Sequence, residues 1–141
     1  MILIIDDERY RMSMMKKNLE GYGYDVTLID SLEDATNFIH NNSGIIDVII
    51  LDIMMPWNSL FNKDDAEFGL VSGYLFYKDI IRKTYGYNIP VIVYTAINKP
   101  NVLNELTKEK NCKVLLKPDR ISNIIKYLNE FNIYPTSKSI I

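Results

Sequence analysis

Apolar residues along this chain gather into five short runs rich in Ile, Val and Leu, separated by longer stretches of mixed character. Runs of this kind are typical of strands buried on both faces, as the inner strands of a parallel sheet are. We therefore predict strands at residues 2–5, 25–29, 46–51, 90–94 and 113–116.

The stretches between the runs carry apolar residues at helical spacing. They predict helices at residues 8–21, 31–41, 72–84, 99–109 and 120–131. Asp6 or Asp7 is expected near the N-cap of the first helix, and Ser31 is the expected N-cap of the second. Strands that alternate with helices indicate an α/β fold. We expect a doubly wound, five-stranded parallel sheet with helices on both faces, in the flavodoxin-like order 2-1-3-4-5.

Charged or hydroxyl residues follow four of the five runs: Asp6 with Asp7, then Asp52, Thr95 and Lys117. In an open α/β sheet the ligand crevice lies outside the carboxyl ends of the strands, so we expect these side chains to converge. Carboxylates a few ångströms apart repel by roughly 4 kcal/mol per pair at an effective dielectric near 20. A divalent cation offsets that repulsion, and Mg²⁺ prefers one or two carboxylates, waters and a phosphoryl oxygen.

The same groups suit a bound phosphoryl group. The Lys117 ammonium can balance its charge, and the Thr95 hydroxyl can donate a hydrogen bond to one of its oxygens. An Asp carboxylate such as Asp52 is also a known acceptor of phosphoryl groups. The pattern therefore predicts one phosphate-handling site at the ends of the strands.

Four motifs in this order resemble the receiver domain of two-component response regulators, of the chemotaxis-type single-domain kind. A single motif would be weak evidence, but four in order, each at a strand end, are specific. The resemblance covers about residues 1–131. The motifs are Ile4-Ile5-Asp6-Asp7-Glu8, Leu51-Asp52-Ile53-Met54-Met55-Pro56, Val93-Tyr94-Thr95-Ala96 and Leu116-Lys117-Pro118.

This resemblance implies that Asp52 accepts a phosphoryl group from a partner histidine kinase or histidine phosphotransfer protein. It implies that Asp7 and Asp52 bind Mg²⁺ directly, with the backbone carbonyl of Met54 as a third ligand, and that Asp6 acts mainly through water. The only chemistry expected is self-phosphorylation from a phosphodonor and slow autodephosphorylation, so the chain is not expected to be an enzyme in the usual sense.

The resemblance also assigns roles to the last two motifs. Thr95 would follow the phosphoryl group and relay its presence, and Lys117 would pair with it. The peptide bond between Lys117 and Pro118 is expected to be cis. The signal would reach a downstream protein through altered binding, or a C-terminal effector domain if the natural chain continues past residue 141.

One departure from the family is a long connection after the phosphoacceptor. Relatives reach a glycine about eight residues past the Asp, a normal loop length, whereas here Gly73 lies 21 positions beyond Asp52. The extra residues, about 57–70, include Trp57. They form either a surface excursion or a lid that controls access to Asp52 or recognises a partner.

Three further positions differ in character. The aromatic residue that relatives place three positions before the Lys is Val114 here, and the sequence does not decide whether Tyr94 or Tyr127 replaces it. Met54 and Ile97 occupy the positions that flank the hydrolytic water in relatives, and their apolar side chains cannot orient a water by hydrogen bonding. We therefore predict a long-lived aspartyl-phosphate.

Composition narrows the remaining classes. A chain of 141 residues, 48% of them hydrophobic, suits one globular domain. A net charge of −2 gives no basic footprint for direct nucleic-acid binding. The lone Cys112 leaves no internal disulfide and fits a reducing cytoplasm. Neither a signal peptide nor a membrane span is expected, so we predict a cytoplasmic protein.

Some features stay open. Residues 132–141 are interpreted as a frayed end or the start of a linker. Many relatives form dimers through their fourth and fifth helices, so a homodimer is possible, although no apolar patch marks an interface here. Competing functions are a receiver-like binding module independent of phosphorylation and an Mg²⁺-dependent phosphohydrolase of the haloacid dehalogenase type. The latter typically has a second Asp two residues past the first, where this chain has Met54.

Overall fold

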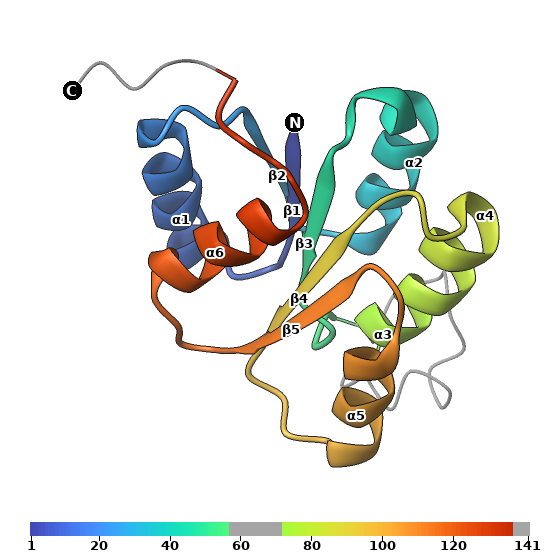
Figure 1. Cartoon of the computed structure of the whole chain (residues 1–141). Helices are drawn as coiled ribbons and strands as arrows, with labels where there is room; N and C mark the ends of the chain where they lie inside the picture. The colour runs from blue at the N-terminus through green and yellow to red at the C-terminus, as the bar shows by residue number, and fades with distance from the viewer. Residues whose placement is uncertain (57–71, 137–141) are drawn as a thin grey trace.

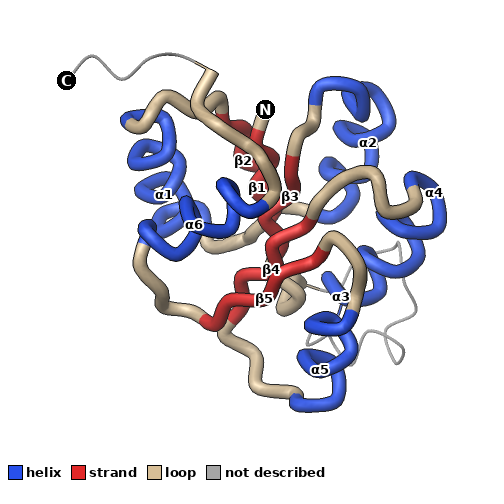
Figure 2. Tube along the Cα trace, viewed as in Figure 1, coloured by secondary structure: helices blue, strands red, loops and turns tan. Residues whose placement is uncertain are grey.

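The computed structural model describes residues 1–56 and 72–136, and a five-stranded parallel sheet forms its centre (Figures 1 and 2). The strands lie in the order β2-β1-β3-β4-β5, and each adjacent pair is parallel. The predicted fold class and strand order are therefore confirmed. The strands are β1 (Ile2–Ile5), β2 (Val26–Ile29), β3 (Val48–Leu51), β4 (Val91–Thr95) and β5 (Cys112–Leu116).

The helices match the predicted positions, with small shifts at their ends. The segment predicted at 72–84 runs through three consecutive parts, of which the middle one, η3, is a π-helix. A short 3₁₀ turn, η1, follows α2, and β3 begins later than predicted. The helical elements are α1 (Arg9–Gly21), α2 (Leu32–Asn42), η1 (Ser43–Ile45), α3 (Ser72–Phe76), η3 (Tyr77–Arg82), α4 (Lys83–Tyr85), α5 (Pro100–Lys108) and α6 (Ile121–Glu130).

The helices cover both faces of the sheet, α1 and α6 on one side and α2, α3, α4 and α5 on the other (Figure 1). Because side chains alternate along a strand, β1 supplies both layers: Leu3 and Ile5 enter one core cluster, Ile2 and Ile4 the other. Every residue of β1, β3 and β4 is buried. Burial of each such side chain contributes about 1.5–3 kcal/mol, so the central strands form a rigid base for the residues that follow them.

Local signals explain where several elements begin. The Ser31 hydroxyl accepts a hydrogen bond from the Asp34 amide at 3.2 Å, so Ser31 caps α2 as predicted. Pro100 stands in the first turn of α5, where its missing N–H costs no hydrogen bond. Gly86 ends α4 with φ of +65°, a conformation that suits glycine.

Arg82 is buried at the end of the sheet where β4 and β5 begin. Its guanidinium lies between the rings of Tyr77 and Tyr87, 4.8 and 4.7 Å from their centroids, and donates to the Tyr77 hydroxyl at 2.8 Å. It also donates to four backbone carbonyls. These belong to Gly86, Ile89, Lys110 and Asn111, at 3.1, 2.8, 3.4 and 3.0 Å.

The described residues after α6 pack against the rest of the domain. Ile133 is buried and donates its amide hydrogen to the Leu128 carbonyl. Thr136 donates to the Gly23 carbonyl from its amide at 3.0 Å and from its hydroxyl at 3.2 Å. The chain is therefore held against the turn after α1 as far as residue 136.

The insertion predicted at residues 57–70, which includes Trp57, lies outside the described ranges. The choice between a surface excursion and a lid therefore stays a prediction. Over residues 1–56 and 72–136, no helix has the length and apolar character needed to cross a membrane.

Candidate functional site

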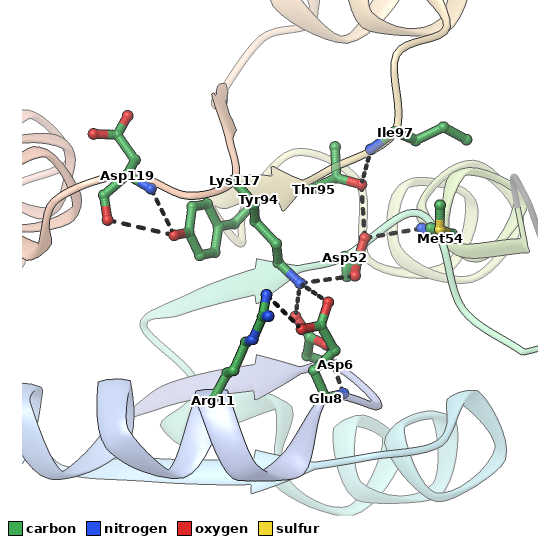
Figure 3. A network of polar contacts seen from close by, with 10 residues as sticks. All are labelled: Asp6, Glu8, Arg11, Asp52, Met54, Tyr94, Thr95, Ile97, Lys117 and Asp119. Atoms are coloured by element: carbon green, nitrogen blue, oxygen red, sulfur yellow. Dashed lines mark hydrogen bonds and ion pairs between the residues drawn. The ribbon is translucent and has the colours of Figure 1, made fainter.

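The candidate site lies where β1, β3, β4 and β5 end, at one edge of the sheet (Figure 3). The parallel registers pair Ile5 with Leu51, Leu51 with Val93, and Thr95 with Leu116, so these strands end close to one another. Direct contacts join four of the predicted site residues, which are Asp6, Asp52, Thr95 and Lys117. The convergence predicted from the strand ends is therefore present in the structure.

Lys117 is the centre of this cluster, with a side chain only 6% exposed. Its ammonium lies 2.7 Å from Asp6 Oδ2, 3.0 Å from Asp52 Oδ2 and 3.1 Å from Glu8 Oε1. Such charge-assisted contacts are about twice as strong as neutral hydrogen bonds. One cation therefore holds together carboxylates from two strand ends, and those carboxylates retain an excess of negative charge.

Asp52 is buried and both of its carboxylate oxygens have partners. Oδ2 contacts Lys117, while Oδ1 accepts hydrogen bonds from the Thr95 hydroxyl at 2.7 Å and the Met54 amide at 2.9 Å. The Thr95 hydroxyl is itself oriented, because it accepts a hydrogen bond from the Ile97 amide at 3.3 Å. The Thr95 hydroxyl and the Lys117 ammonium thus contact different oxygens of the buried Asp52 carboxylate.

Ser72 and Gly73, at the start of α3, fix the chain just after Asp52. The Gly73 amide donates to the Ile53 carbonyl at 2.9 Å, and the Ser72 hydroxyl donates to the Met55 carbonyl. A Cβ atom at Gly73 would lie 2.2 Å from the Asp52 carbonyl oxygen, closer than atoms can approach. Only glycine permits this contact, which agrees with the place that the sequence assigned to Gly73.

The three consecutive acids after β1 divide between the site and solvent. Asp7 is exposed, whereas Asp6 is buried and Glu8 is half-buried against Lys117. Glu8 was missed from the sequence, although its spacing of two from Asp6 was a usable signal, because alternate residues of an extended chain share a side. Glu8 is also the N-cap residue of α1, and its amide donates to Asp6 Oδ1 at 2.9 Å.

The acidic groups suit a hard divalent cation. Carboxylate oxygens of Asp6, Glu8 and Asp52 all lie within 4.8 Å of one another. Mg²⁺ prefers such oxygen donors. The predicted ligands were Asp6, Asp7, Asp52 and the Met54 carbonyl; Glu8 adds a carboxylate to this cluster, and Asp7 is exposed. The contact that Met54 makes in the structure is from its backbone amide, which donates to Asp52 Oδ1.

Burial and charge shift the pKa values of these groups. Desolvation raises the pKa of Asp6 above its ordinary value, despite the hydrogen bond from Lys117, and the charge of Asp52 adds to the rise. Desolvation and the charge of Asp52 also raise the pKa of Asp7. Burial alone would lower the pKa of Lys117, but the hydrogen bond with Asp6 and the charge of Asp52 raise it. Lys117 therefore stays protonated at neutral pH.

Other predicted features take their places around this cluster. The peptide bond between Lys117 and Pro118 is cis, as the resemblance implied. Met54 is 38% exposed beside Asp52, and Ile97 is buried. Val114 is half-buried, Cys112 is a buried free thiol, and the exposed His40 stands on the surface.

The chain matches the family model of the response regulator receiver domain over residues 2–129. Two curated relatives are the two-component response regulators EHD1 of Oryza sativa subsp. indica and ORR30 of Oryza sativa subsp. japonica. Each is 25% identical over 123 residues, which is 87% of this chain. The chain spans only 31% of the length of each relative.

Solved structures share this fold. A two-component response regulator from Clostridium difficile is 23% identical with a TM-score of 0.72, and the comparison covers 93% of both chains. A receiver domain protein from Clostridium thermocellum is 25% identical with a TM-score of 0.72, over 92% of this chain and 91% of that one. The receiver domain of the Francisella response regulator 1452 is 26% identical with a TM-score of 0.69, over 92% and 93%.

Proposed function

Because this chain belongs to the response regulator receiver domain family, we propose that it accepts a phosphoryl group on Asp52 and signals by changing the partner it binds. One observation carries the proposal: the buried Asp52 carboxylate is held between the Thr95 hydroxyl at 2.7 Å and the Lys117 ammonium at 3.0 Å. Asp52 supplies the nucleophile, and the other two groups supply hydrogen-bond donors for the oxygens of a phosphoryl group.

In the proposed reaction, a carboxylate oxygen of Asp52 attacks the phosphorus atom of the donor. A bond forms between that oxygen and phosphorus, the bond from phosphorus to the leaving group breaks, and its electron pair departs with the leaving group. Thr95 and Lys117 then transfer their hydrogen bonds from the carboxylate to phosphoryl oxygens. Their present partners are thus replaced rather than lost.

Mg²⁺ would be held among Asp6, Asp7, Glu8, Asp52 and the Met54 carbonyl, where it would offset the negative charge of the carboxylates and the phosphoryl group. The cluster of Asp6, Glu8 and Asp52 oxygens supports this assignment. Asp7 lies between Asp6 and Glu8 in the sequence and is exposed to solvent. Its share in the metal site is tested by comparing Mg²⁺ affinity of Asp7→Asn with that of Glu8→Gln.

We further propose the partners that this chemistry requires. The phosphodonor would be a histidine kinase or a histidine phosphotransfer protein, and the receiver of the signal a protein or a linked effector domain. The free thiol of Cys112 suits a cytoplasmic place for this relay. A phosphohydrolase of the haloacid dehalogenase type has less support, because Met54 stands where its second Asp would be.

The aspartyl-phosphate is expected to be long-lived. Neither Met54 nor Ile97 offers a side-chain hydrogen bond to orient an attacking water, and the Ile97 amide already donates to Thr95. The decay of the phosphorylated protein with Mg²⁺ present, followed by intact mass, measures this. Met54→Asn and Ile97→Glu should each shorten the lifetime, and a wild-type lifetime of seconds would contradict the expectation.

The proposal itself is tested by intact mass after incubation with acetyl phosphate. We expect a single phosphoryl adduct on the wild type when Mg²⁺ is present, and none after chelation of the metal. Asp52→Asn should give no adduct. Asp47→Asn is the matched control, because Asp47 is an exposed acid just before β3 and should leave the adduct unchanged. A wild type that binds Mg²⁺ but takes no adduct would favour a receiver-like module whose signal is not phosphorylation.

A further inference from the structure

Tyr94 stands directly before Thr95 at the end of β4, on the opposite face of the sheet. It is a buried tyrosine, 5% exposed, packed in the cluster under α1 and α6. Its hydroxyl accepts a hydrogen bond from the Asp119 amide at 3.0 Å and donates one to the Asp119 carbonyl at 3.4 Å. The Tyr94 hydroxyl therefore hydrogen-bonds both the amide and the carbonyl of Asp119.

The ring of Tyr94 also lies next to the ammonium of Lys117. The Lys117 ammonium is 5.7 Å from the ring centroid, within the range of a cation–π contact. Figure 3 shows the tyrosine with its hydroxyl at Asp119 while the Lys117 side chain points to the carboxylates. The Lys117 amide donates to the Thr95 carbonyl at 2.8 Å. Both sides of the cis bond are therefore tied to adjacent residues of β4.

The main chain beyond Tyr94 continues into α6. The Asp119 carboxylate accepts hydrogen bonds from the Arg120 amide at 2.7 Å and from Asn123 Nδ2 at 2.6 Å. A groove of about 270 Å³, lined in part by Tyr94, Lys117, Asp119 and Ile121, separates this turn from α1. A movement of Lys117 thus has a continuous path of contacts to the start of α6.

We propose that Tyr94 is a positioning residue for Lys117 and the link that carries a change of Lys117 partners to the turn between β5 and α6. The inference rests on the proposed phosphoacceptor function. It gives a physical role to Tyr94 in a chain whose residue 114 is valine, which has neither a ring nor a hydroxyl. The hydroxyl transmits the change, and the ring supports the ammonium.

Two substitutions separate these parts. Tyr94→Phe keeps the ring and removes only the hydroxyl, whereas Tyr94→Leu removes both. Tyr127→Phe is the matched control. The Tyr127 ring on α6 also lies near a lysine of β5, with its centroid 5.6 Å from the Lys113 ammonium, but Lys113 pairs with Glu130. Each protein is titrated with Mg²⁺ alone and then with beryllofluoride in the presence of Mg²⁺, while backbone amide NMR signals are recorded.

In the wild type and in Tyr127→Phe, beryllofluoride should shift the amide signals of Met54, Thr95, Asp119 and Asn123. In Tyr94→Phe, the shifts at Met54 and Thr95 should persist while those at Asp119 and Asn123 fall to less than about half. Mg²⁺ affinity should stay within about twofold of the wild type. Tyr94→Leu should also lose about fivefold in beryllofluoride affinity, the fold-change of a cation–π contact near 1 kcal/mol.

The outcomes are distinct. Undiminished shifts at Asp119 and Asn123 in Tyr94→Phe would overturn the role of the hydroxyl, even if Tyr94→Leu failed to fold. If Tyr94→Leu lost Mg²⁺ affinity and beryllofluoride affinity by the same factor, the cause would be a general structural defect, and the positioning role would be overturned. If beryllofluoride left the wild-type signals unchanged, the phosphoacceptor proposal itself would fail, and this inference with it.

Discussion

Two buried cations stand at opposite ends of the sheet, and their partners are of different kinds. Arg82, where β4 and β5 begin, donates to four backbone carbonyls and a tyrosine hydroxyl. Lys117, where β5 ends, is held by the carboxylates of Asp6, Asp52 and Glu8. Backbone carbonyls belong to the fold and stay in place, whereas carboxylates can exchange an ammonium for a metal ion.

This difference separates a structural cation from a functional one. The guanidinium of Arg82 has five donors in a rigid fork, and each of its acceptors is fixed by the chain around it. Lys117 has three donors on a flexible stem, all directed at groups that carry charge. We therefore expect changes at the Arg82 end to alter stability alone, and changes at the Lys117 end to alter chemistry first.

The largest effect is expected from Lys117→Ala. It removes the cation that would face the phosphoryl group, so the rate of phosphorylation by acetyl phosphate should fall about 100-fold or more. Lys113→Ala is the matched control on the same strand, since Lys113 is 41% exposed and pairs with Glu130 at 3.5 Å. A Lys117→Ala protein phosphorylated at the wild-type rate would contradict the assigned role.

Arg82→Ala should give the largest loss of stability. It leaves the buried Ile89 carbonyl and the partly buried Asn111 carbonyl without this donor, and it empties the space between Tyr77 and Tyr87. We expect a decrease in the free energy of unfolding of about 3 kcal/mol in urea titrations. The exposed neighbour Lys83→Ala should change it by less than about 0.5 kcal/mol. A changed phosphorylation rate in folded Arg82→Ala would contradict the expectation that changes at the Arg82 end alter stability alone.

Mg²⁺ should stabilise one end without affecting the other. A ligand that binds only the folded state adds about 2.7 kcal/mol at a concentration of 100 times its Kd. We expect the same increment in the wild type and in Arg82→Ala, and a much smaller one in Asp52→Asn. Urea titrations with and without Mg²⁺ measure the three increments. Equal increments in all three proteins would place the metal elsewhere.

The smallest effect is a pH dependence of the metal-free protein. The pKa of Asp6 is raised by its burial, so between its ordinary value and the raised value the folded state binds more protons than the unfolded state. Stability from this group therefore increases as the pH falls through that window and decreases as the pH rises. Asp6→Asn should remove this part of the slope in unfolding measured between about pH 4 and pH 7. An unchanged slope would show that Asp6 does not titrate there.

The sequence predicts the Lys117 end of the molecule well because its signals are local. Each site residue follows an apolar strand, and parallel strands end at the same edge. The choice among Asp6, Asp7 and Glu8 was harder, because it depends on the direction of the chain as it enters α1. Only the folded geometry shows that Glu8 contacts Lys117 and that Asp7 is exposed.

The Arg82 end could not be predicted in the same way. Arg82 lies in a helix whose sequence gave a simple helical spacing, but the π-helical turn at Tyr77–Arg82 changes which side chains face inward. Its acceptors come from loops before β4 and β5, and a carbonyl acceptor leaves no trace in residue type. The contact between Tyr94 and Asp119 is hidden from the sequence for the same reason.

The most direct test of the account is a crystal structure of the protein with Mg²⁺ and beryllofluoride. We expect a beryllofluoride group joined to the Asp52 carboxylate through a bond between beryllium and oxygen, with Thr95 and Lys117 moved from that carboxylate onto fluorine atoms. We also expect the contacts of Arg82 to stay as they are in the metal-free protein. A structure in which Asp52 carries no beryllofluoride group, or in which Lys117 keeps all three carboxylates while Arg82 changes its acceptors, would contradict the roles proposed for Asp52 and Lys117.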